Sequence, residues 1–377
     1  MSSSDSGRVR AVLDYAAARM LDATVLERIG IAIASTTLAL LIGLIIVAAA
    51  GHNPIRFANQ LVVGSFGSER AIARTLRYST IFVLAGIAVA IAFRAGVFNI
   101  GVQGQFIVGG IATVISIIWL APLLPDGMIG GAVLILVGTL AAVISGGLYA
   151  ALPGVLKAYG GANEIITTIM LNFIAIGFVG WLVSSPFNDP ESTATRTERL
   201  PDNVSLPSIV FEDPNLSIVG LIVTIAVVAF VAIVMTRTSF GYDMVTSGYQ
   251  QSAAKYSGVD AKRMIVSTMT FSGIVAGLAG AVFVIMIQGY YTDPSGVGNY
   301  GFDAIAISLL AANNPIGVIP AGILFGGLES ASSHIQINSN VPVQLIDGVV
   351  GLVVLFVAVP ELFRMIARRT GLGGDDR

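Results

Sequence analysis

The chain has 377 residues, of which 55% are hydrophobic and 11% are charged, and its formal net charge is −2. Soluble domains carry roughly 25% charged residues, so this composition excludes a soluble globular enzyme. The near-neutral charge, without a basic run, excludes a nucleic-acid-binding protein. There is no cysteine and there are two histidines, His52 and His334, which leaves no thiolate metal site and little material for histidine-based catalysis.

The first 28 residues come before the apolar stretches and carry charges of both signs. They contain four arginines, Arg8, Arg10, Arg19 and Arg28, alongside four acidic residues. No small-residue cleavage site follows a hydrophobic core, so this segment is not a cleavable signal peptide. Apolar side chains recur at helical spacing. We therefore expect residues 1–28 to form an interfacial amphipathic helix on the cytoplasmic side, with a disordered tail as the alternative.

Ten mostly apolar stretches follow, and a membrane span needs about 20 such residues. In chain order they are Ile29–Ala50, Tyr78–Phe93, Ala95–Pro125, Gly127–Leu156, Ile165–Asn188, Pro214–Thr236, Met264–Thr292, Ala304–Ala312, Ile316–Leu328 and Val343–Pro360. The second is short, which suggests a helix that stops inside the membrane. The pattern predicts an all-α polytopic membrane protein of about ten transmembrane helices, within a range of eight to ten, some of them broken or re-entrant. The transmembrane domain would cover residues 29–361, and residues 362–377 would form a cytoplasmic tail.

The distribution of lysine and arginine indicates the orientation. With ten spans and both termini in the cytoplasm, the inside segments hold 14 basic residues and the outside segments hold six. The exception is the cluster from Arg70 to Arg77, which falls outside. We expect that cluster on a short amphipathic helix at the outer surface.

Two polar, glycine-containing segments interrupt the apolar pattern, one in each half of the chain: Arg94–Gln105 and Ala311–Pro320. Backbone at membrane depth must find partners or line water. Paired interruptions of this kind are typical of internal repeats with a substrate path between them. Two tight polar turns at the membrane surface are the alternative.

Small residues four positions apart occur in two of the later stretches. Gly273 and Gly277 form one such pair, and Gly322 and Gly326 form another. Glycine at this spacing allows two helices to approach closely in lipid. We interpret both pairs as packing surfaces.

The longest inside loop covers residues 236–263. It contains a predicted short helix over residues 250–257, which Gly258 would end as the C′ residue. Ala253 and Ala254 would give this helix a small, smooth face that suits docking into a groove of another protein. An ordinary interhelical loop is the alternative.

Four stretches carry a resemblance to a known family: Arg94–Gln105 (RAGVFNIGVQGQ), Gly161–Asn172 (GANEIITTIMLN), Ser252–Val259 (SAAKYSGV) and Phe271–Gly280 (FSGIVAGLAG). With them the chain resembles the membrane permease subunits of ABC importers in the ribose, nucleoside and branched-chain amino-acid group. The first two stretches look most like the nucleoside and simple-sugar branch. Gln103 stands where many relatives have glutamate, which removes a charge near the presumed path.

The resemblance implies a permease subunit of an ATP-driven importer in the cell membrane. Its solute would be small, neutral and sugar-containing: a simple sugar such as glucose or ribose, or a nucleoside. Its partners would be a cytoplasmic ABC ATPase, a second homologous permease and an extracellular solute-binding lipoprotein. A heterodimer of permeases is favoured and a homodimer stays open. The chain would be a non-catalytic subunit that holds no cofactor or metal, and the partner ATPase would use the ATP. The residues agree independently on one point: without a phosphate-binding loop the chain cannot hydrolyse ATP by that route.

The same resemblance assigns the predicted short helix as the coupling helix in the ATPase groove. Its residues would be Gln250, Gln251, Ala253, Ala254, Tyr256 and Gly258.

Neutral amides supply the polar chemistry expected at depth. We expect Asn99, Gln103, Gln105 and Asn172 to project towards a mid-membrane path, joined from the other half by Asn313 and Asn314, with Phe98 or Phe173 stacking on a ring. Amides donate and accept hydrogen bonds without the desolvation cost of a charge, which suits a hydroxyl-rich solute. The alternative is that these amides satisfy the backbone of the broken helices.

Two other transport mechanisms remain open on the residues alone. A sodium-coupled secondary transporter or a passive channel for small neutral solutes would function without an ATPase. No predicted span carries a central Asp, Glu or His of the kind that forms a proton relay, which weakens proton coupling. An intramembrane enzyme lacks candidate chemistry.

Overall fold

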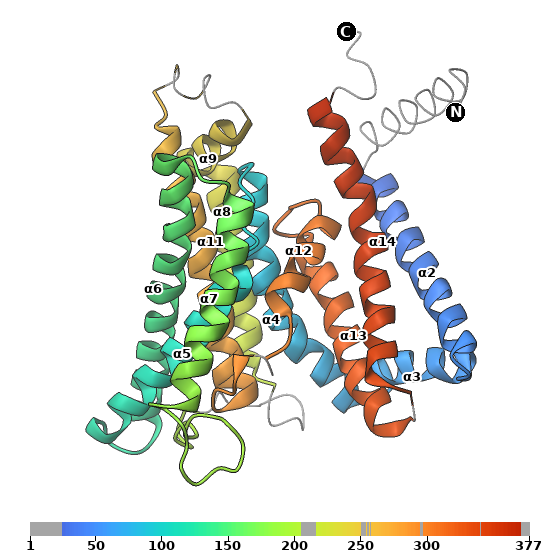
Figure 1. The fold of residues 1–377 in the computed structure, drawn as a ribbon, viewed down its shortest axis with the longest axis horizontal. Helices are drawn as coiled ribbons and strands as arrows, with labels where there is room; N and C mark the ends of the chain where they lie inside the picture. The colour runs from blue at the N-terminus through green and yellow to red at the C-terminus, as the bar shows by residue number, and fades with distance from the viewer. Residues whose placement is uncertain are drawn as a thin grey trace. The chain divides into compact units, whose positions relative to one another are not determined.

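The structure is a computed structural model that describes residues 25–204, 216–249, 254, 256, 258–294, 297–339 and 341–370 (Figure 1). Over these residues the regular elements are helices, and the one β-type pairing is an isolated antiparallel bridge between Arg196 and Thr292. The described chain falls into two compact units. The larger comprises residues 62–333, and the smaller comprises residues 25–61 with residues 334–370.

The helices follow the apolar stretches of the sequence. They are α2 (Val25–Ala49), α3 (Pro54–Phe66), α4 (Glu69–Arg94), α5 (Val102–Leu120), α6 (Met128–Gly160), α7 (Glu164–Ser184), α8 (Ile218–Arg237), α9 (Ser239–Tyr249), α11 (Ala261–Phe283), α12 (Tyr300–Leu310), α13 (Val318–Asn338) and α14 (Val343–Thr370). A short 3₁₀ helix, η1 (Ala121–Leu123), extends α5, and a π-helix, η2 (Val284–Gln288), extends α11.

Six helices in the described residues are long and apolar enough to cross a membrane: α4, α5 with η1, α6, α7, α8, and α11 with η2. Three shorter apolar helices cover Ile33–Ala49, Tyr300–Leu310 and Gln344–Phe356. The all-helical, polytopic prediction is confirmed, and each predicted stretch overlaps a helix. The count of about ten spans is not confirmed.

The start of α4 differs from the sequence-based expectation. The prediction of a short helix over Tyr78–Phe93 is wrong, because α4 begins at Glu69, where the Ser68 hydroxyl accepts a hydrogen bond from the Ala71 N–H at 3.1 Å. The cluster from Arg70 to Arg77 therefore belongs to the first turns of α4 and not to a separate helix. Its charges ended the apolar run in the sequence, but a Ser N-cap and an acidic first turn favour a helix there.

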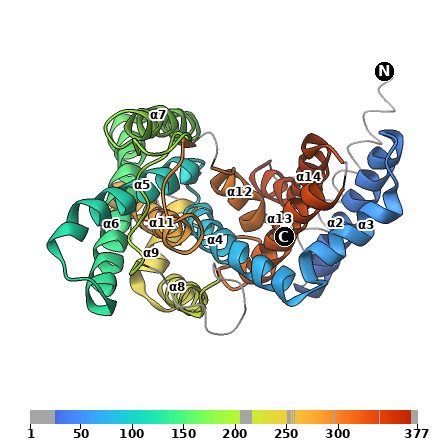
Figure 2. The ribbon, with the colours of Figure 1, turned by 90° about the horizontal axis from the view of Figure 1, so that it is seen from below.

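The core of the larger unit is α11, which packs against α4, α5 and α6 (Figure 2). Glycine makes this close packing possible. A Cβ placed on Gly109 of α5 would lie 2.5 Å from the Cα of Gly277 in α11, and one on Gly146 of α6 would lie 2.8 Å from the same atom. One on Gly277 would overlap the carbonyl oxygen of Ala142. The interpretation of Gly273 and Gly277 as a packing surface is confirmed.

Outer helices of this unit present apolar side chains away from its core. On α7, Phe173, Phe178 and Trp181 are all more than half exposed. Exposed apolar faces of this size are stable where lipid surrounds the helix, as expected for a membrane protein. By contrast, α4 and α11 are buried along most of their length.

The smaller unit packs α2 against α14, which lie side by side in Figure 1. Its core is built from Val47, Phe57, Ile335, Ile346 and Val349. Gly43 permits the close approach of the two helices, since a Cβ there would lie 2.8 Å from Val349 Cγ1.

The glycine packing of α11 gives a stability prediction. We expect Gly277→Ala to destabilise the protein by about 1–3 kcal/mol, because the added methyl group has no space between α11 and α6. Gly177→Ala in α7 is the matched control, because a Cβ there meets nothing within 4 Å. The measurement is thermal unfolding of the purified protein in detergent. Equal melting temperatures for the two variants would contradict the packing described for α11.

Candidate functional site

The break between α4 and α5 begins with a glycine-terminated helix end. Gly96 adopts a φ of 68°, a conformation that L side chains rarely take. The Gly96 N–H donates to the Phe93 carbonyl, and the Val97 N–H donates to the Ala92 carbonyl, both at 3.0 Å. This is a Schellman-type ending with glycine at C′. The chain then runs without regular structure to Gly101, where α5 starts without a side-chain cap of its own.

A reciprocal amide pair holds this non-helical segment. Asn99 and Gln105 exchange two hydrogen bonds, each of 3.0 Å, between their side-chain amides. Asn99 also donates to the Ser272 hydroxyl of α11 at 2.8 Å and accepts from the Gly101 N–H at 3.0 Å. Asn99, Gln105 and Ser272 are all buried. The pair thus ties the first turn of α5 to α11.

Asn172 on α7 supplies hydrogen-bond partners to the same break. Its Oδ1 accepts from the Gly104 N–H at 2.8 Å, and its Nδ2 donates to the Ile100 carbonyl at 2.9 Å. A helix start leaves several N–H groups without intrahelical partners. Asn172 therefore caps α5 from a neighbouring helix and satisfies the carbonyl that precedes it.

Gln103 joins the beginnings of two helices. Its Oε1 accepts from the Gly301 N–H at 2.7 Å, and its Nε2 donates to the Gly298 carbonyl at 3.1 Å. Both partner groups lie at the start of α12. A carboxylate could accept from Gly301 but could not donate to Gly298. The amide at this position, where the family resemblance led us to expect glutamate, therefore fits both of its neighbours.

The second break, between α12 and α13, is satisfied locally. Ala312 and Asn313 both have positive φ, 50° and 57°. The Ser308 hydroxyl donates to Asn313 Oδ1 at 2.9 Å, and Asn314 Oδ1 accepts from the Ile316 N–H at 3.0 Å. A left-handed conformation costs an alanine such as Ala312 roughly 1–2 kcal/mol, whereas asparagine adopts it more readily. This turn is therefore strained, and its amides serve the residues beside them.

The two aromatic candidates lie in different surroundings. Phe98 packs edge-to-face on Phe93 at a centroid distance of 5.1 Å, within the first break. Phe173 is 62% exposed on the outer face of α7, although the adjacent Asn172 is buried. The structure therefore brings Asn99, Gln105, Asn172 and Gln103 together around the start of α5, and it places Phe173 apart from them.

The four amides around α5 are enclosed by protein in this conformation. Their exposed fractions are 0–2%, and each side-chain nitrogen and oxygen has a hydrogen-bond partner. Here they satisfy the broken backbone. Solute binding by the same amides stays a prediction and requires a conformation in which these bonds open.

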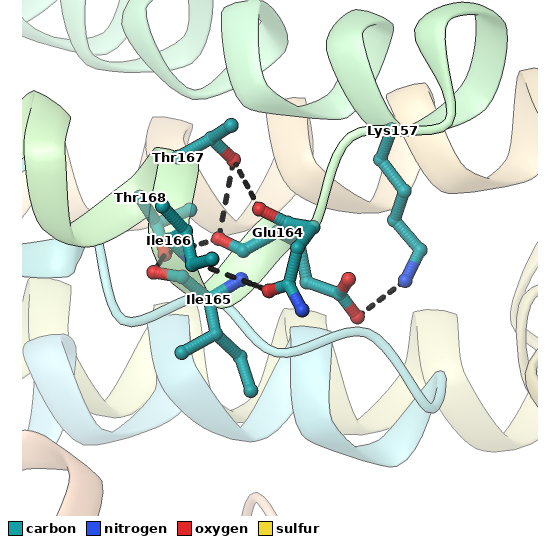
Figure 3. Close-up of polar contacts among 7 residues, drawn as sticks. Lys157, Glu164, Ile165, Ile166, Thr167 and Thr168 are labelled. Atoms are coloured by element: carbon teal, nitrogen blue, oxygen red, sulfur yellow. Dashed lines mark hydrogen bonds and ion pairs between the residues drawn. The ribbon is translucent and has the colours of Figure 1, made fainter.

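An ion pair next to the site was not predicted from the sequence. Lys157, near the end of α6, pairs with Glu164, the first residue of α7, and the two side chains are 20% and 14% exposed (Figure 3). Asn163 caps α7 through hydrogen bonds from the N–H groups of Ile165 and Ile166. These contacts fix the turn between α6 and α7. The available signal was a base and an acid flanking two adjacent glycines.

The loop over residues 236–263 contains more helix than predicted. It begins with α9, which the sequence did not suggest. Three predicted coupling residues, Gln250, Gln251 and Ala253, lie outside the described residues.

The end of the predicted short helix can be described. Ala254 is buried and Tyr256 is 95% exposed. Gly258 has a φ of 84°, and the Val259 N–H donates to the Ala254 carbonyl at 2.9 Å. This is the helix ending expected from a glycine at C′.

A comparison with protein families assigns the chain. The family described as "Branched-chain amino acid transport system / permease component" matches residues 71–358, a range that contains both breaks and the loop. The chain belongs to this permease family. The resemblance identified from the four sequence stretches is thereby confirmed.

Curated relatives match nearly the whole chain. It is 32% identical over 333 residues to the guanosine ABC transporter permease protein NupP of Bacillus subtilis, covering 87% of this chain and 92% of the relative. It is 31% identical to the nucleoside ABC transporter permease protein NupB of Lactococcus lactis, covering 86% and 89%. It is 28% identical to the glucose ABC transporter permease protein TsgB13 of Haloferax volcanii, covering 90% and 89%. No solved structure matches the chain.

The bonds of Asn172 generate a test of the amide cluster. We expect Asn172→Leu to lower the melting temperature, because it leaves the Gly104 N–H and the Ile100 carbonyl unpaired at about 1–3 kcal/mol each. The adjacent Phe173→Leu is the control, since Phe173 is exposed on the same helix. Thermal unfolding in detergent measures both. An unchanged melting temperature for Asn172→Leu would show that this amide does not brace the break.

Proposed function

We propose that this chain is the membrane permease subunit of an ATP-driven ABC importer for a small neutral solute that contains a sugar ring. The observation that carries the proposal is its similarity, over 86–90% of its length, to three permease proteins named for guanosine, nucleoside and glucose transport. The energy comes from a separate ATPase chain. The rival mechanisms, ion coupling and passive conduction, have no such support.

A nucleoside is the favoured solute. The two more similar of the three relatives are named for nucleosides, at 32% and 31% identity. Glucose is the second candidate because the third relative, at 28% identity, is named for glucose. Both solutes present neutral hydroxyl groups, which neutral amides bind without the desolvation cost of a charge.

Passage of the solute requires α5 and α12 to separate at their beginnings. Gln103 bonds to Gly298 and Gly301 in this conformation. In an open conformation its amide would exchange these bonds for solute hydroxyls, and Asn99 and Asn172 would line the same opening. The amide cluster thereby has two uses: it closes the path and it binds the solute.

The assembly has the partners expected from the family resemblance. A second homologous permease completes the pore, a solute-binding lipoprotein delivers the solute from outside, and the ATPase binds the cytoplasmic loop over residues 236–263. Both termini lie in the cytoplasm, in keeping with 14 basic residues inside against six outside.

Reconstitution tests the energy source. Proteoliposomes that hold the chain with its sister permease, ATPase and binding protein should accumulate labelled guanosine only with ATP, and excess unlabelled glucose should compete weakly. The chain reconstituted alone should neither conduct the solute nor respond to a sodium gradient. Uptake by the chain alone, driven by sodium or down the solute gradient, would overturn the proposal. Accumulation of glucose in preference to guanosine would reassign the solute.

Tyr256 tests the docking of the ATPase. It is 95% exposed in the loop, whereas Ala254 is buried, so Tyr256 is the better contact residue of the two. We expect Tyr256→Ala to weaken copurification of the ATPase by about tenfold. Aromatic side chains that become buried against a partner are frequent hot spots of interfaces. Trp119→Ala at the end of α5 is a control, because Trp119 is also exposed, at 67%. Equal copurification by both variants would remove Tyr256 from the interface.

A further inference from the structure

The last turn of α9 touches the first helix break through bare backbone. A Cβ placed on Gly248 would overlap the Ala95 carbonyl and lie 3.0 Å from the Gly96 nitrogen. A Cβ placed on Gly96 would lie 2.8 Å from the Gly248 carbonyl oxygen. No flexible side chain lies between the two segments at this point. A shift of α9 is therefore passed directly to the end of α4, because close-packed contacts transmit strain.

The contact lies close to the amide cluster along the chain. Gly96 ends α4, and Asn99, three residues later, bonds to Gln105 and Ser272. Val97, between them, belongs to a buried apolar cluster with Ile265 and Met269 of α11.

The other end of the loop continues into α11, a helix that contacts the break. α11 begins at Ala261, where the loop over residues 236–263 meets it, and Asp260 caps this start through hydrogen bonds from the Lys262 and Arg263 N–H groups. The loop therefore contacts the break directly through Gly248 of α9. At its other end it continues into α11, which itself meets the break at Val97 and Asn99.

A small cavity beside the contact joins a third element to it. Its lining includes Gly96, Gly248, Ser247 and Lys157. Lys157 pairs with Glu164 at the start of α7, the helix that carries Asn172. The loop, the break and the end of α6 thus line one cavity, and the ion pair joins the end of α6 to the start of α7.

We propose that Gly96 and Gly248 are positioning residues that transmit movement of the loop to the helix break and hence to the amides around α5. This inference rests on the proposed function, because the ATPase supplies the movement. Glycine is required at both positions because a Cβ on either residue would collide with the backbone of the other segment. At Gly96 it is also required by a φ of 68°.

Control substitutions at other glycines separate the steric collision from the backbone strain. Gly289 has the same φ of 68° but nothing within 4 Å of a Cβ, so Gly289→Ala reproduces the backbone strain of Gly96→Ala without the collision. Gly177→Ala is the control for Gly248→Ala, since Gly177 is helical and a Cβ there meets open space.

The decisive measurement is the number of ATP molecules hydrolysed per solute taken up by the reconstituted complex. We expect Gly96→Ala and Gly248→Ala to raise this ratio about tenfold, a typical size for the coupling between two sites. The two control variants should keep the wild-type ratio. A merely structural role would lower the amount of active complex, so hydrolysis and uptake would fall together and the ratio would not change.

A second pair of variants, at Ser247, is used if Gly96→Ala and Gly248→Ala prevent assembly of the complex. Ser247→Gly softens the turn of α9 that carries Gly248, and Ser247→Ala removes the same hydroxyl without adding flexibility. We expect the glycine variant to raise the ratio and the alanine variant to leave it unchanged. Wild-type complex without ATP-dependent uptake would refute the proposed function itself. If the wild-type complex couples hydrolysis to uptake and the variants that assemble keep its ratio of ATP hydrolysed to solute taken up, only the role of the two glycines is overturned.

Discussion

The structure depends on satisfying the backbone where α4 ends and α5 begins. Hydrocarbon offers no water to an unpaired N–H or carbonyl, so a helix can stop at depth only if other groups take over its hydrogen bonds. Asn99 and Asn172 do this for Gly101, Gly104 and Ile100. Neutral amides suit the task, because each has both donors and acceptors and avoids the larger cost of burying a charge.

The glycine packing and the amide cluster depend on each other. Ser272, which accepts from Asn99, reaches the break because α11 lies against α5 and α6 at glycine contacts, including Gly109 to Gly277. The second break has no comparable support from other helices among the bonds of Asn313 and Asn314, and the positive φ of Ala312 strains it. The two interruptions therefore differ in kind: the first is braced by neighbouring helices, and the second is a strained local turn.

The sequence predicted the parts that follow from local pattern. It placed the helical stretches, both interruptions and the helix end at Gly258. For the amides it offered bonding to the broken backbone only as the alternative to lining a solute path, and these backbone bonds are the ones present here. It failed at Glu69, because an apolar-run criterion stops at Arg77 although a Ser68 cap favours starting earlier. It also missed α9 and the Lys157–Glu164 pair, although both lie within short continuous segments of the chain. The role of Ser272 depends on a residue that folding brings to Asn99 from a distant part of the chain. The outward direction of Phe173 beside the buried Asn172 is likewise set by helix packing.

On the proposed function, the amides explain why the chain needs energy from another protein. Replacing a protein hydrogen bond with one to a solute hydroxyl changes the free energy little, because a hydrogen bond contributes a net of only about 0.5–1.5 kcal/mol. Opening Gln103 from Gly298 and Gly301 towards a solute is then nearly balanced. A balanced exchange gives a path that opens in both directions and cannot accumulate solute. Direction must come from a process that favours first one conformation and then the other. The backbone contact of Gly248 with Gly96 offers a route by which such a process reaches the amides.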